Sequence, residues 1–67
     1  MSKVIILWLV LSGGPPPGTH TYIMNDFRNM EDCVATRQVV EAKEPLRARF
    51  PQFATAALLC LPAGVRP

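Results

Sequence analysis

The stretch VIILWLVL, residues 4–11, decides the fold of this 67-residue chain, because it places eight apolar residues in a row between Lys3 and the breaker SGGP. A strand rises about 3.3 Å per residue, so this run has the length of an ordinary buried strand, whereas a membrane-spanning helix needs roughly 20 apolar residues. We therefore expect no membrane span. Two interpretations stay open: a central strand, or the core of a signal peptide covering residues 1–14.

A proline-rich loop and a second strand are predicted next. Residues 12–19 contain three consecutive prolines and three glycines, which remove backbone donors and regular dihedrals, so the first strand must end there. Residues 20–27 (HTYIMNDF) are rich in strand-favouring residues. The loop between the strands is longer than a tight hairpin turn, and we expect it to be exposed, mobile or held by a partner.

A helix is predicted to begin after Asn29, whose side-chain oxygen can accept from a free N–H group of the first turn. Glu31 and Asp32 then lie near the positive end of the helix dipole. Pro45 removes a helical donor, so the helix should end at residues 43–44. At 100° per residue, one arc of about 120° forms the predicted core-facing stripe of the helix. Its apolar members are Met30, Cys33, Val34 and Val40.

Arg37 lies inside this same arc. We expect its aliphatic stem to pack on the core while the guanidinium reaches water and pairs with Glu41, one turn away. A ligand-binding arginine is the alternative. Beyond the helix, residues 46–50 predict one further helical turn, closed by Pro51. Residues 55–61 (TAALLCL) predict a third strand, followed by a short tail over residues 62–67.

The order strand, strand, helix, strand predicts a small α+β fold, a single domain over residues 1–67. The first strand is the most apolar, so we place it in the centre of a three-stranded sheet, antiparallel to both neighbours, in spatial order 2-1-3. One helix can cover only one face of this sheet. Both sides of the central strand are apolar, however, because odd and even positions alike carry large aliphatic or aromatic side chains.

An uncovered face with four large apolar side chains would be a contiguous exposed patch, and such patches usually mark association surfaces. We therefore predict a protein partner or self-association through this strand and the proline loop. The alternative is that the loop and the tail fold back over the face. The predicted interaction surface consists of Ile5, Leu7, Trp8, Leu9, Pro15, Pro16 and Pro17.

Cys33 and Cys60 are the only cysteines, and both fall on predicted core positions of separate elements. If the third strand packs beneath the helix, they can form a disulfide, which we expect to stabilise the fold by roughly 3 to 4 kcal/mol. Such a bond needs an oxidising compartment or protection inside a particle. In a reducing cytoplasm both residues would act as small buried hydrophobes.

The sequence contains few of the residue patterns that catalytic or ligand-binding sites require. His20 is the only histidine, so a zinc site lacks its usual clusters of ligands, and a cysteine nucleophile lacks a recognisable base with its orienting group. The glycine-proline loop lacks the Lys-Ser/Thr of a phosphate loop. The basic residues are scattered, unlike the basic stripe of nucleic-acid binders. We predict no enzyme, no cofactor, no metal, no small-molecule substrate and no nucleic-acid partner.

The layout from an initial apolar strand, through Phe27, Met30 and Cys33 at the helix start, to the lone Cys60 in the last strand resembles short two-cysteine proteins of bacteria and their phages. The resemblance implies a two-cysteine mini-domain and no activity. From the doubly apolar first strand we expect a non-catalytic structural or interaction subunit, such as a phage particle component, in the virion or the host cytoplasm. The alternatives are an exported, disulfide-bonded small protein that has lost residues 1–14, and a small inhibitor of one host protein.

Overall fold

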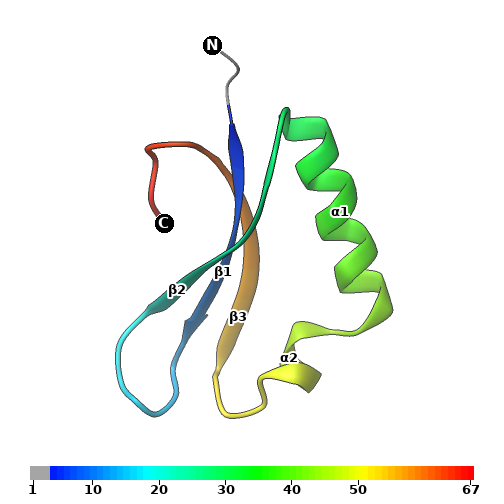
Figure 1. Cartoon of the computed structure of the whole chain (residues 1–67). Coiled ribbons are helices and arrows are strands. Elements are labelled where there is room, and N and C mark those ends of the chain that lie inside the picture. Colours follow the sequence, from blue (N-terminus) through cyan, green and yellow to red (C-terminus); the bar gives the residue numbers. More distant parts are fainter. Residues whose placement is uncertain (1–3) are drawn as a thin grey trace.

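The computed structural model describes residues 4–67 and confirms the predicted architecture (Figure 1). Three antiparallel strands form one sheet in the order β2-β1-β3, and a helix packs on one of its faces. The elements are β1 (Ile5–Ser12), β2 (His20–Phe27), α1 (Met30–Lys43), α2 (Leu46–Arg49) and β3 (Thr55–Pro62). The apolar run is thus the central strand of an α+β fold.

The central strand β1 alternates between two environments. Its odd-numbered residues are buried and its even-numbered residues are half-buried. Because successive side chains of a strand point to opposite faces, one face of the sheet is covered and the other is open. The core lies on the covered face. Its buried residues are Ile5, Leu7, Leu9, Leu11, Cys33, Leu46 and Leu58.

Strand β2 contains an irregularity that the sequence pattern does not predict. Asn25 lies opposite Leu7 and Ile23 lies opposite Trp8, so Met24 has no partner on β1 and forms a β-bulge. The backbone N–H of Asp26 donates to Asn25 Oδ1 at 2.8 Å. A bulge and a charged residue both protect an edge strand against unwanted pairing, and β2 forms one edge of this sheet.

The ends of helix α1 agree with the predicted signals. Asn29 is the N-cap, with its Oδ1 accepting from the backbone N–H of Asp32 at 2.8 Å. At the other end, Glu44 adopts extended backbone, as expected for a residue that precedes a proline. The second helical turn, α2, places Leu46 in the core.

The inward face of α1 differs from the predicted stripe. Cys33 is completely buried and Val40 packs against the core, but Met30 is 42% exposed. The prediction of Met30 as a core residue is wrong: a residue in the first turn lies at the end of the helix, where fewer neighbours cover it. Arg37 is half-buried, and its Nε lies 3.7 Å from Glu41 Oε1, which confirms the predicted pair.

The two cysteines form a disulfide that ties the first turns of α1 to β3. Their Cα atoms are 6.1 Å apart, within the usual range for disulfides. Cys60 lies opposite Leu7 on the covered face of the sheet, directly beneath the helix. The predicted pairing of Cys33 with Cys60 is confirmed.

Candidate interaction site: the open sheet face

The open face of the sheet presents apolar side chains from all three strands. Along β1 they are Ile6, Trp8 and Val10, and the register pairs these residues across both neighbouring strands. Trp8 lies between Ile23 of β2 and Leu59 of β3. We define the open face by its apolar members: Ile6, Trp8, Val10, Ile23, Ala57, Leu59 and Leu61.

This face carries almost no charge. The three strands contain no Lys or Arg, and Asp26, opposite Ile6 on the edge strand β2, is their only carboxylate. Ile23 is 62% exposed, so the centre of the face next to Trp8 is open on the β2 side. A partly exposed tryptophan flanked by aliphatic side chains is typical of the central residues that contribute most to protein–protein binding.

Trp8 itself has an unusual polar environment. Its side chain is half-buried, yet within residues 4–67 its Nε1 atom is buried without a hydrogen-bond acceptor. Leaving a buried donor unpaired costs about 1–3 kcal/mol. The indole is therefore held by apolar packing between β2 and β3 rather than by a polar anchor.

The structure corrects part of the predicted interaction surface. Ile5, Leu7 and Leu9 are buried on the face that α1 and α2 cover, so they are not available to a partner in this state. Of the strand residues predicted for that surface, Trp8 alone lies on the open face. The two sides of β1 are equally apolar in sequence, so hydropathy alone did not indicate which side the helix would cover.

The proline loop, residues 13–19, is fixed at its base and exposed at its tip. The backbone N–H of Ala54 donates to the carbonyl of Gly13, and His20 Nε2 lies 2.9 Å from the carbonyl oxygen of Pro16. The His20 ring also packs edge-on against Phe53, with centroids 5.8 Å apart. The predicted surface residues Pro15, Pro16 and Pro17 are all exposed, and the Pro15–Pro16 peptide bond is cis.

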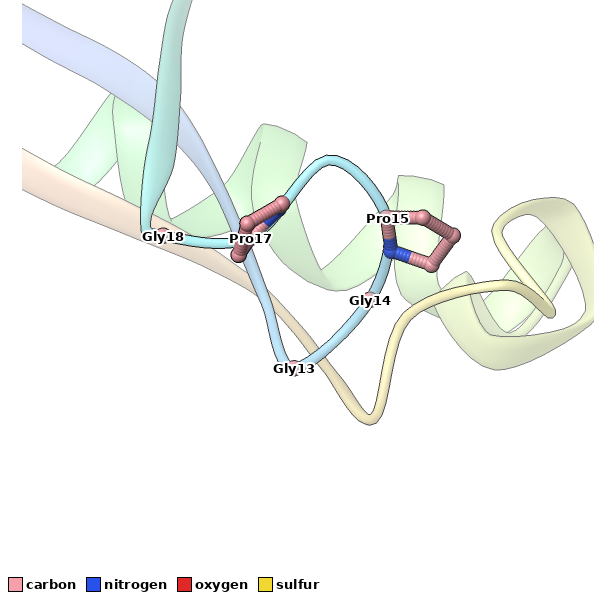
Figure 2. A pocket seen from close by; sticks show the side chains of 5 residues that line it. All are labelled: Gly13, Gly14, Pro15, Pro17 and Gly18. Carbon is pink, nitrogen blue, oxygen red and sulfur yellow. The ribbon is translucent and has the colours of Figure 1, made fainter.

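Figure 2 shows the residues that line an open hollow inside this loop. The volume of this hollow is about 460 Å³. Glycine backbone and proline carbons form its lining, and no lining side chain can donate or accept a hydrogen bond. Ligand pockets normally combine apolar walls with a few well-placed polar groups. Only backbone groups, and no polar side chain, could therefore orient a small molecule in this hollow. It is lined by Gly13, Gly14, Pro15, Pro17 and Gly18.

The C-terminal tail leaves much of the open face accessible. The backbone N–H of Ala63 donates to Val4 O at 2.8 Å, and the N–H of Val65 closes a turn on Pro62 O. Figure 1 shows the tail, in red, turning away from α1. Residues 62–67 are all exposed and Ile23 is 62% exposed, so the tail and the loop leave the β2 side of this face uncovered.

Metal sites and membrane-spanning helices were the other features sought in the part of the chain that the structure describes. Within residues 4–67, no three His, Cys, Asp or Glu side chains come together as a metal site would require. No helix in this range is long and apolar enough to cross a membrane.

Comparison of the chain with models of protein families, with curated proteins and with solved structures finds no match. The resemblance to two-cysteine proteins of bacteria and phages stays a prediction.

Proposed function

We propose that this protein is a non-catalytic interaction subunit that binds another protein through the open face. The observation that carries the proposal is the uncovered side of β1, where Trp8 lies between Ile23 and Leu59 with no charged neighbour on β3. The sheet has one helical layer, and the smallest dimension of the Cα trace is only 11 Å. Two-layered domains normally bury the apolar faces of their sheets, so a partner would supply the missing cover.

The setting that we propose is an assembly such as a phage particle. The support is the apolar open side of β1 and the resemblance noted above. A disulfide inside a particle is protected from cellular reductants, which fits the Cys33–Cys60 bond.

The disulfide also favours a second candidate, an exported small protein. Disulfides persist chiefly in oxidising compartments, and small domains in such compartments often depend on them. Removal of a signal peptide over residues 1–14 would, however, delete β1, which pairs with both β2 and β3. We therefore favour export only for a chain that retains β1.

The substitution Ile23→Lys tests the open face. Ile23 is exposed, so we expect a change in unfolding free energy within about 0.5 kcal/mol, but a new charge beside Trp8 should weaken partner binding about tenfold or more. Val39→Lys is the matched control, because Val39 is a comparably exposed aliphatic residue on α1. The readouts are the binding of a hydrophobic dye and of a captured partner, together with light scattering.

Wild-type protein should bind the dye, Ile23→Lys should bind much less of it, and Val39→Lys should match the wild type. A monodisperse small monomer that binds no dye would overturn the proposal. Equal loss of partner binding in both lysine variants would also contradict it, because the effect would then follow net charge rather than the open face.

A further inference from the structure

Helix α1 is attached to the sheet by few apolar contacts besides its disulfide. Of its 14 residues, Cys33 alone is buried, and Cys33 and Val40 are its only members among the core residues and the hydrophobic side chains packed against them. The rest of the covering layer comes from Leu46, Phe50 and Phe53, which follow α1 in the chain. An amphipathic helix of this length normally buries a continuous apolar stripe.

The centre of the face that α1 turns toward the sheet is unfavourable for packing. Arg37 lies between Cys33 and Val40, and within residues 4–67 its buried Nε has no hydrogen-bond partner. The Glu41 carboxylate is 3.7 Å away, too far for a hydrogen bond, and it is about half exposed. Undocking α1 would return the Arg37 Nε–H group to water and remove the cost of its unpaired donor.

From these contacts we infer that the Cys33–Cys60 bond is a redox latch that holds α1 over the sheet. Without the bond, α1 is held on the sheet by Val40 and its partly buried neighbours alone. The free-energy cost of burying the unpaired Arg37 Nε opposes this packing. Reduction then releases the helix and uncovers a second apolar surface, the helix-covered side of β1. Its residues next to the disulfide are Ile5, Leu7 and Leu9.

The reaction is thiol–disulfide exchange with a dithiol reductant. A reductant thiolate attacks Cys60 Sγ first, because Cys60 is half-buried whereas Cys33 is completely buried. The S–S bond breaks, Cys33 leaves as a thiolate and takes a proton, and a mixed disulfide forms on Cys60. The second reductant thiol then displaces Cys60. The products are two protein thiols and the oxidised reductant, after a transfer of two electrons and two protons.

Amide hydrogen exchange of the full chain, with and without dithiothreitol, tests the latch. On reduction we expect the amides of α1 to exchange about a hundredfold faster or more, while the paired amides of β1 keep their protection. Dye binding should rise at the same time. Unchanged protection of α1 would overturn the inference, as would loss of the whole sheet together with the helix, because the bond would then be a general staple.

A variant separates the latch from general destabilisation. Arg37→Leu replaces the unpaired donor by an apolar side chain at the centre of the inward face, so α1 should stay docked and protected after reduction. Arg47→Leu, on the exposed side of α2, is the control and should release α1 as the wild type does. If reduced Arg37→Leu exchanged as fast as the reduced wild type, the proposed weakness at Arg37 would be wrong.

The latch is independent of the proposed function of the open face. Reduction acts on the side of β1 beneath α1, whereas Ile23→Lys changes the other side. Failure of the exchange experiment would leave the open-face proposal intact. Failure of the Ile23→Lys experiment would likewise leave the latch intact.

Discussion

At the scale of single residues, the clearest local device is the cap of α1. Asn29 Oδ1 accepts from the backbone N–H of Asp32, one of the donors that a helix start leaves without an intrahelical partner. Asn29→Ala should therefore lower the unfolding free energy by about 1 kcal/mol, measured by urea denaturation. Asn29→Ser keeps an acceptor and should cost much less. If both variants lost the same stability, the cap bond would not be the cause.

Residue-level chemistry was also the part of the structure best predicted from sequence. The Asn29 cap, the helix end before Pro45 and the Arg37–Glu41 pair depend on neighbours within one or two turns, so the sequence contains the information. Two features depend instead on how far the sheet extends beneath the helix: the exposure of Met30 and the burial of Arg37 Nε. No local sequence pattern predicts that extent.

At the scale of elements, the contact between the proline loop and residues 52–54 depends on a glycine. A Cβ atom at Gly14 would collide with the carbonyl oxygen of Gln52 and lie 2.9 Å from Phe53 Cδ1. Gly14→Ala should lift the loop from these residues and destabilise the fold by about 1–3 kcal/mol. In NMR spectra, the signals of Gln52 and Phe53 should shift.

Gly18→Ala is the control for this prediction. Gly18 has a φ of +108°, so alanine is strained there, but its Cβ would meet nothing within 4 Å. The stability of this variant should fall while the signals of Gln52 and Phe53 stay in place. A shift of the same signals in both variants would show that strain within the loop, rather than the collision at Gly14, governs the contact.

The order of the strands was predictable, whereas the face of the candidate site was not. A run as apolar as β1 requires neighbours on both edges, which fixes the order β2-β1-β3 once the helix connects β2 to β3. Ile5, Leu7 and Leu9 were wrongly assigned to the accessible surface, because β1 lacks the polar alternation that marks a solvent face. The bulge at Met24 was not predictable from the sequence pattern either. It is defined by the pairing of Asn25 with Leu7 and of Ile23 with Trp8.

At the scale of the whole molecule, the fold depends on β1. This strand pairs with β2 and β3 and supplies Ile5, Leu7, Leu9 and Leu11 to the core. A chain that starts at Pro15 should therefore fail to fold, with the far-ultraviolet circular dichroism of an unstructured chain even when oxidised. Non-reducing intact mass of the natural protein is the companion measurement. A folded protein whose mass lacks residues 1–14 would contradict the central place of β1.

The disulfide also determines how the oxidised chain would respond to a pulling force. The paired ends of β1 and β3 lie side by side, with Ile5 opposite Pro62, so tension between the two termini opens this pair one hydrogen bond at a time, like a zip. Once the strands separate, the load passes through β2 to Cys33 and crosses the sulfur bridge to Cys60. Residues 34–59, with most of α1 and all of α2, lie outside that mechanical path and stay slack at any extension that leaves the bridge intact.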